Sequence, residues 1–284
     1  MSIGELRLLT SLEIAALLMV PCGLWLCGKR KSLVTADATT DLETAPPYRL
    51  GGMDLGMGLM LYAVMALLSF GAKWWTFYHP VEPGTGDRTI NATMVWTQFF
   101  FVQGTQLAIV WAWLRVRQSS MTEVFGMTRL GFFRTLRSAA LCILPAGIIA
   151  TLSLVLMLQL LQALGWPMEP QEAVSLLSGA NTVGVQIALA FVACLGAPVV
   201  EEVLFRGMLF GSLRQMTNRW FAAIVSALLF GIIHLHVPSL PALCLLGFFF
   251  ALAYEFTGSL TVSIVMHAIF NSVQVIIAIL HAGK

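Results

Sequence analysis

The stretch from Gly196 to Phe210 reads Gly-Ala-Pro-Val-Val-Glu-Glu-Val-Leu-Phe-Arg-Gly-Met-Leu-Phe. Its three charged residues, Glu201, Glu202 and Arg206, stand in a segment that is otherwise apolar on both sides. Apolar runs of this kind are typical of helices that cross a membrane. A charged side chain at the centre of such a helix costs about 2.5–3.5 kcal/mol, so these residues mark a candidate functional site.

The composition of the whole chain indicates a membrane protein. Of the 284 residues, 58% are hydrophobic and 11% are charged, whereas soluble domains carry roughly 25% charged residues. The net charge of +2 is small, and no basic cluster interleaved with aromatic residues indicates a nucleic-acid partner. The five cysteines lie in apolar runs, which is typical of buried thiols rather than of a disulfide or zinc framework.

The apolar runs predict an all-α fold, a polytopic transmembrane helical bundle with about eight spans. A backbone exposed to lipid must satisfy its own hydrogen bonds, and these runs are too long and continuous for the strands of a barrel. The predicted spans cover about 11–28, 53–78, 92–114, 138–164, 181–200, 220–236, 241–257 and 260–280.

Lysine and arginine are concentrated in alternate loops. Lys29, Arg30 and Lys31 follow the first span and five arginines lie in the third loop, while the loops at 79–91 and 165–180 together contain one arginine. By the positive-inside rule, this distribution predicts cytoplasmic basic loops and an N-terminus on the outside. A basic flank after the apolar run also favours a retained span over a cleaved signal peptide.

Helical geometry separates the three charges of the quoted stretch. Glu202 and Arg206 are four residues apart, so they share a face and can pair. Glu201 is rotated by about 100° from its neighbour and points elsewhere, away from that arginine. Pro198 removes a backbone hydrogen bond just before the site and favours a kink there. A cluster at the membrane boundary, reaching the headgroups, is the alternative interpretation.

Two later apolar runs also contain unexpected polar residues. His234 lies near the end of one run, where an interfacial histidine is the simpler interpretation, and His236 is interpreted as interfacial. His267 and Asn271 are four residues apart in the last run and share a face. Such a pair commonly makes hydrogen bonds between helices. Polar groups from three separate helices favour one shared interior site.

In this order, the three motifs resemble the CPBP family, which groups type II CAAX prenyl endopeptidases with bacteriocin-processing and immunity (Abi) membrane proteins. The motifs are Glu-Glu-x-x-x-Arg at 201–206, Phe-x-x-x-His at 230–234 and His-x-x-x-Asn at 267–271. The resemblance covers about residues 185–280. We therefore expect residues 136–284 to form a CPBP-like intramembrane protease core, with unassigned transmembrane helices in residues 1–135.

The resemblance implies a role for each matching residue. Glu201 is expected to activate a water molecule, with His234 as its partner. His267 and Asn271 are expected to donate to the oxyanion that forms on the scissile carbonyl. Glu202 and Arg206 are expected to order the site. The predicted set is therefore Glu201, His234, His267 and Asn271 as catalytic residues, with Glu202 and Arg206 as supporting residues.

These residue types suit peptide hydrolysis, which requires a base for the water and donors for the tetrahedral oxygen. Glu201, His234 and His267 could alternatively hold zinc as a two-histidine, one-carboxylate site of a metalloprotease. The cofactor is therefore unknown. The metal-free glutamate mechanism is favoured, because Asn271 is an unusual zinc ligand and a good oxyanion donor.

The predicted function is an intramembrane endopeptidase acting on a peptide or membrane-protein substrate in the lipid bilayer, with CAAX-type processing of prenylated substrates as one form. Two alternatives stay open: a non-catalytic immunity or scaffold protein of the same family, and a proton-coupled transporter. The predicted spans place Glu201 and His234 at different depths. A shared site requires the helix that carries Glu201 to continue past Arg206 to about residue 215.

Overall fold

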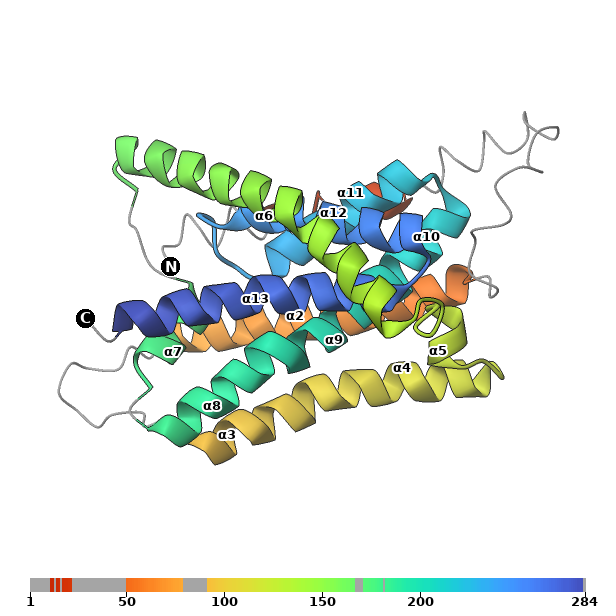
Figure 1. The fold of residues 1–284 in the computed structure, drawn as a ribbon, viewed down its shortest axis with the longest axis horizontal. Helices are drawn as coiled ribbons and strands as arrows, with labels where there is room; N and C mark the ends of the chain where they lie inside the picture. The colour runs from red at the N-terminus through yellow and green to blue at the C-terminus, as the bar shows by residue number, and fades with distance from the viewer. Residues whose placement is uncertain are drawn as a thin grey trace.

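The structure is a computed structural model that describes residues 11, 12, 14, 15, 17–21, 50–78, 91–166, 171–180 and 182–282. Across these residues the chain forms helices and no strands (Figure 1). The elements after the N-terminal segment are α2 (Gly52–Tyr78), α3 (Ala92–Gln98), η1 (Phe99–Gly104), α4 (Thr105–Val116), α5 (Met121–Val124), α6 (Phe132–Ala163), α7 (Glu172–Ser178), α8 (Val183–Phe191), η2 (Val192–Gly196), α9 (Ala197–Glu202), η3 (Val203–Phe210), α10 (Gly211–Met216), α11 (Arg219–Ile233), α12 (Leu240–Thr257) and α13 (Leu260–Ala282).

The predicted all-α membrane fold is confirmed. Six helices of the described part are long and apolar enough to cross a membrane, and α11 is a shorter apolar helix. The count of about eight spans is not confirmed, because the first predicted span, 11–28, lies largely outside the described residues. The predicted orientation of the loops and of the N-terminus stays a prediction.

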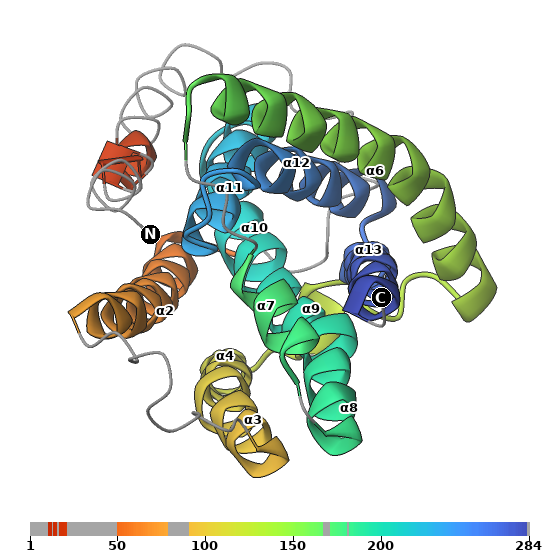
Figure 2. The same cartoon turned by 90° about the vertical axis from the view of Figure 1, so that its left-hand side faces the viewer.

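One long helix runs through the centre of the bundle. It consists of α8, η2, α9, η3 and α10 and covers Val183–Met216 without a break. Seen end-on, this helix passes between α2 on one side and α13 on the other (Figure 2), and it contacts both. The span predicted at 181–200 was therefore too short. Continuation to Met216 places Glu201 near the middle of the helix, as a shared site requires.

The two π-helical segments of the central helix, η2 and η3, flank α9 on both sides. In a π-helix each turn contains an extra residue, and such turns are frequent at functional sites. The N–H of Ala197 accordingly reaches five residues back to the carbonyl of Val192. The N–H of Gly211 likewise bonds to the carbonyl of Arg206. Glu201 and Glu202 thus lie on a short α-helical piece between two irregular turns.

A buried carboxylate joins α2 to α4. The Asp54 side chain is fully buried and accepts hydrogen bonds from the backbone N–H of Gly51, at 2.7 Å, and from the indole N–H of Trp113, at 2.9 Å. A guanidinium nitrogen of Arg117 lies 3.3 Å from the same carboxylate. Sequence reasoning did not single out Asp54, which lies only two residues inside α2.

The start of α13 is held by the segment between α5 and α6. The N–H of Leu260 donates to the carbonyl of Phe125 at 3.0 Å, and the hydroxyl of Thr261 donates to the carbonyl of Met127 at 2.8 Å. Gly126, between these acceptors, has a positive φ of 59°, and a Cβ atom there would collide with the carbonyl of Gly258. This contact fixes where α13 begins and therefore which way its later side chains point.

We predict that Gly126→Ala destabilises the protein more than Gly165→Ala. Both glycines have positive φ, but a Cβ atom at Gly165 would meet nothing within 4 Å. Strained backbone of this kind costs about 1–3 kcal/mol at either position, and only Gly126→Ala adds a steric clash. Thermal unfolding of the two purified variants in detergent, followed by circular dichroism, tests the difference. Equal unfolding temperatures would contradict the close contact between Gly126 and Gly258.

Candidate active site

The centre of the site is a buried ion pair. The side chains of Glu202 and Arg206 are both 0% exposed, and a guanidinium nitrogen lies 2.9 Å from the carboxylate Oε1. The predicted pairing across one helical turn is therefore present. The same oxygen lies 3.0 Å from Nδ1 of His267, on α13. Since a carboxylate only accepts, we assign the hydrogen to Nδ1 of His267.

Aromatic rings and a backbone carbonyl surround the guanidinium of Arg206. It lies over the ring of Phe230 at 4.4 Å and near the ring of Phe250 at 5.2 Å, and it donates to the carbonyl of Gly247 at 3.0 Å. Aromatic faces attract a cation most strongly when water is excluded. A Cβ atom at Gly247 would lie 3.0 Å from the guanidinium and 3.1 Å from the backbone of α11. The missing side chain at Gly247 therefore makes room for the arginine.

Glu201 points away from this pair, as its rotation on the helix predicts. Its side chain is 18% exposed, and Oε2 lies 3.9 Å from Nε2 of His267. Within the described residues its carboxylate accepts no hydrogen bond, in contrast to the carboxylate of Glu202. His267 therefore faces both acids, Glu202 through Nδ1 and Glu201 through Nε2.

His234 lies at the C-terminal end of α11, where it is the cap residue. Its Nδ1 lies 2.8 Å from the carbonyl of Phe230, so Nδ1 carries the donated hydrogen. The ring of Phe230 separates the two histidines, with ring centroids 4.9 Å from His234 and 5.6 Å from His267. The phenylalanine of the Phe-x-x-x-His motif thus touches both histidine rings and the guanidinium of Arg206.

Asn271 uses its side-chain amide to reach the irregular part of the central helix. Its Nδ2 donates to the carbonyl of Ala193 in η2 at 2.8 Å. In an α-helix this carbonyl would accept from Ala197, but that N–H bonds to Val192 instead. The residue one position further, Pro198, has no N–H to offer. The π turn and the proline together leave a carbonyl that the asparagine can bind.

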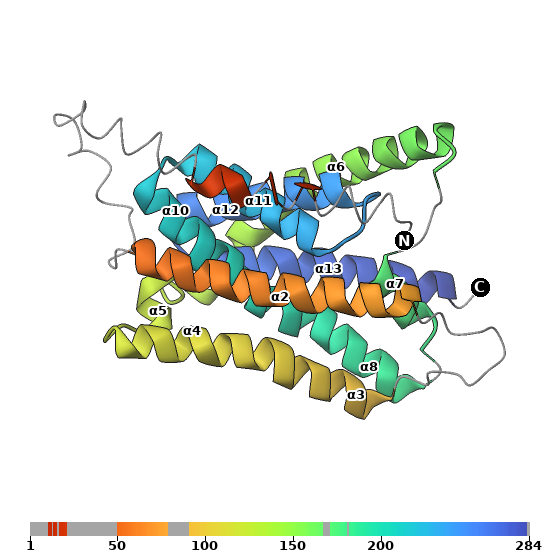
Figure 3. The same cartoon turned by 180° about the vertical axis from the view of Figure 1, so that it is seen from behind.

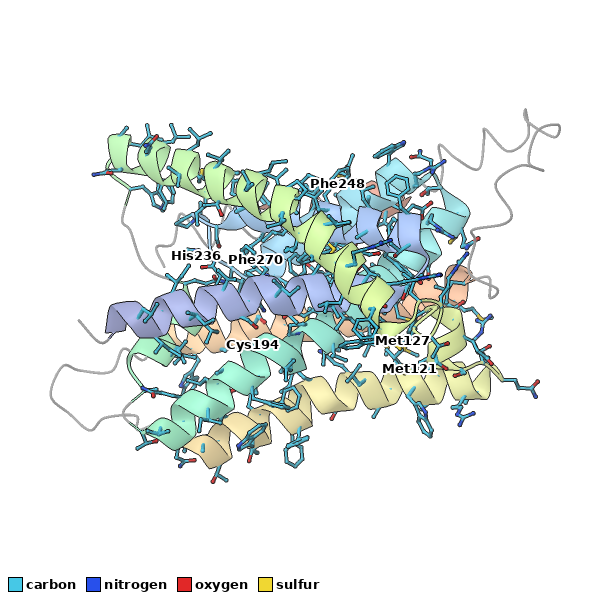
Figure 4. All side chains as sticks on the ribbon, in the orientation of Figure 1. Met121, Met127, Cys194, His236, Phe248 and Phe270 are labelled. Carbon is cyan, nitrogen blue, oxygen red and sulfur yellow. The ribbon has the colours of Figure 1, made fainter. Side chains whose placement is uncertain are left out.

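Glu201, His234, His267 and Asn271 all line one cavity of about 300 Å³. Its other walls are mostly apolar and come from α7, α8, η2, α12 and α13, including Leu177, Leu246 and Phe270. Figure 4 shows the side chains that fill the space between α12 and α13, where Phe270 is labelled. His236 is not among the lining residues and binds the hydroxyl of Ser239.

The residues named as a zinc alternative do not form a metal centre in this structure. Among the described residues, no group of three or more His, Cys, Asp or Glu side chains is placed to hold a metal ion. Nδ1 of both His234 and His267 is bonded within the protein, at 2.8 and 3.0 Å, which leaves Nε2 of each ring as the nitrogen that could face a ligand. Because the described side chains are not grouped as metal ligands, we assign no step to a metal.

Sequence reasoning missed two parts of the site. It assigned Glu202 to Arg206 alone, but the carboxylate also holds His267, which is 65 residues away in the chain. It also gave no role to Phe250, whose ring stacks on that of His267 with centroids 5.1 Å apart. An apolar residue in an apolar helix gives no signal of this kind.

We predict that Arg206→Met destabilises the protein much more than Arg214→Met. Both arginines pair with a glutamate, but Arg206 and its partner are fully buried while Arg214 and Glu255 are partly exposed. Removing one member of a fully buried pair costs about 3–5 kcal/mol, and a pair that keeps some contact with water costs less to break. Chemical denaturation of both variants measures the difference. Similar losses would contradict a core organised around Arg206.

The sequence comparisons agree with this arrangement. The profile of the family described as type II CAAX prenyl endopeptidase Rce1-like matches residues 183–273, which contain all three motifs. No solved structure gives a significant match.

Two curated bacterial proteins are similar to the same part of the chain. YdiL of Bacillus subtilis (strain 168), which its name assigns provisionally to the membrane peptidases, is 35% identical over 88 residues, covering 31% of this chain and 36% of YdiL. The membrane-embedded CAAX protease MroQ of Staphylococcus aureus (strain USA300) is 35% identical over 103 residues, covering 34% of this chain and 41% of MroQ. The chain thus matches well under half the length of either relative. All three motifs lie inside the matched segment, so the comparisons support the resemblance to the CPBP family on which the prediction rested.

Proposed function

We propose that this protein is an intramembrane endopeptidase that hydrolyses a peptide bond with a water molecule activated by Glu201 and His234. The observation that supports it is the shared cavity, which is lined by Glu201, His234, His267 and Asn271 in walls that are otherwise mostly apolar. The enzyme names of the matched family and of MroQ agree with a protease. The proposed core is residues 136–284.

Two groups are available to take a proton from the water. The carboxylate of Glu201 accepts no hydrogen bond among the described residues and faces the cavity. His234 donates from Nδ1 to Phe230, so its neutral ring carries a lone pair on Nε2. A base contributes about 10²–10⁴-fold to a rate when it lies within reach of the proton. In the proposed reaction, the proton passes to this pair and then to the leaving amine.

His267 and Asn271 are the proposed donors to the oxyanion. With Nδ1 bonded to Glu202, His267 can donate from Nε2 only as an imidazolium. Two carboxylates face this ring, Glu202 at Nδ1 and Glu201 at Nε2. Asn271 donates one amide hydrogen to the carbonyl of Ala193, and the second hydrogen remains available for the substrate.

The proposed substrate is a peptide or membrane-protein segment that enters from the bilayer, and CAAX-type processing near a C-terminus is one form. The cavity walls favour apolar side chains next to the scissile bond, since Leu177, Leu246 and Phe270 line it. The proposal includes substrates that carry a prenyl group. The helices in residues 1–135 lie outside the matched segment.

We predict that Glu201→Gln reduces peptide cleavage at least 100-fold while the protein keeps its fold. The amide has nearly the shape of the carboxylate but cannot act as a base, and loss of a general base costs about 10²–10⁴-fold. Cleavage of a peptide library by protein in lipid nanodiscs, analysed by mass spectrometry, gives the rate. Leu195→Ala, an exposed position on the same helix, is the matched control.

A peptide-cleavage rate in Glu201→Gln equal to that of the wild type would contradict the proposed mechanism. Peptide binding without cleavage in the wild type would instead favour the scaffold alternative. Flux of protons or solutes into liposomes, with no cleavage, would favour the transporter alternative. These three outcomes are separated by measuring binding, cleavage and flux on one preparation.

We predict that Asn271→Ala lowers kcat about 10²–10³-fold with little change in KM. The loss of one donor to an oxyanion has an effect of that size, since the bond forms only as the transition state is reached. Steady-state kinetics on one cleaved peptide measure both constants. The control is Ser272→Ala on the next position of α13, whose hydroxyl bonds only within its own helix. A rise in KM with unchanged kcat would assign Asn271 to substrate binding instead.

A further inference from the structure

The turn that follows His234 is strained. Leu235 has a positive φ of 49°, a backbone conformation that is uncommon for any residue other than glycine and strained for a bulky one. The N–H of Leu235 bonds to the carbonyl of Ile232 at 2.9 Å, so α11 closes in a tight last turn. A strained backbone persists only where its surroundings hold it. The direction of His234 therefore depends on what holds this turn.

Helix α2 supplies part of that support. Leu235 and Val237 are buried side chains that form a small cluster with Phe70 of α2 and Met157 of α6. One turn further along α2, the ammonium group of Lys73 donates to the carbonyl of Leu235 at 3.0 Å. Phe70 and Lys73 are three residues apart and share a face of the helix. From behind, α2 runs across the front of the molecule beside α11 (Figure 3), and the two helices are in contact.

Lys73 binds just past the C-terminal end of α11, which ends at Ile233 and is capped by His234. The last carbonyls of a helix carry partial negative charge, so a cation close to them is stabilising. Lys73 lies near the end of the apolar span Gly52–Trp75, a position from which the long stem of a lysine commonly reaches the headgroups. A lysine that only reached the headgroups would not turn to a carbonyl 162 residues away in the chain.

We infer that Lys73 is a positioning residue, which holds the turn after His234 and so aims the histidine at the cavity. The inference rests on the proposed function of His234. It gives α2 a role in the reaction, although α2 lies outside residues 183–273, the segment that matches the family. The active site then comprises the matched helices together with a helix from the N-terminal part of the chain.

The test is a double-mutant cycle on kcat. Lys73→Met keeps the apolar stem and removes the donor, and we expect it to lower kcat about 10- to 100-fold, the scale of a misplacement near 1 Å. Lys73→Arg retains a donor and is expected to restore most of the rate. In a His234→Gln background, Lys73→Met should have no further effect, because the group through which it acts is gone. Val64→Ala, an exposed position on α2, is the matched control and should behave as wild type.

Equal fold losses from Lys73→Met in both backgrounds would overturn the inference, since they would indicate a general structural role. An unchanged kcat in Lys73→Met would also overturn it. Should Lys73→Met not fold, Lys73→Gln takes its place in the same cycle.

Hydrogen exchange separates this inference from the proposed function. The amides of residues 234–237 and of Ser239 should exchange faster in Lys73→Met than in wild type, and Lys73→Arg should restore protection. If the wild type cleaves no peptide, the proposed function fails while exchange still reports whether Lys73 holds the turn. Unchanged exchange in Lys73→Met would reject the positioning contact whatever the activity.

Discussion

One carboxylate oxygen of Glu202 accepts from both Arg206 and His267, and this shared bond joins the central helix to α13. Neither cation nor carboxylate could stay buried alone, because an unpaired charge in an apolar interior is strongly destabilising. The bond fixes the orientation of the His267 ring, so that its Nε2 faces Glu201 and the cavity. Arg206 in turn lies against Phe230 and the carbonyl of Gly247, which brings α11 and α12 into the same arrangement.

The irregular backbone of the central helix complements that ion pair. A regular helix satisfies its own carbonyls and offers nothing to a neighbouring side chain. The π turn before α9 and the missing N–H of Pro198 leave the carbonyl of Ala193 for Asn271. The ion pair and this bond lie on the same two helices, one turn apart on α13. Together they fix the register of α13 against the central helix, and with it the place of both proposed oxyanion donors.

The parts of the site that depend on local geometry could be predicted from the sequence. The pairing of Glu202 with Arg206 and the different direction of Glu201 follow from 100° per residue on a helix. The helix boundaries followed from apolar runs, except that the span carrying Glu201 was predicted to end at residue 200, whereas the helix continues to Met216.

Contacts between distant segments could not be predicted in this way. The bond from Glu202 to His267 and the bond from Lys73 to Leu235 join residues 65 and 162 positions apart. Asp54 was missed for a related reason: a charge near the start of an apolar run is usually solvated, and only packing against Trp113 shows that this one is buried. The roles of the four cavity side chains in catalysis stay predictions.

The position of Glu201 in a cavity has a consequence for any substrate. In an α-helix each peptide carbonyl is hydrogen-bonded within the helix, and the side chains surround the backbone. In the proposed reaction, a substrate segment that spans the bilayer as a helix would therefore have to unwind before its peptide bond could reach Glu201. Segments that fray easily, such as chain ends and stretches near glycine or proline, would be cut in preference to the middle of a stable helix.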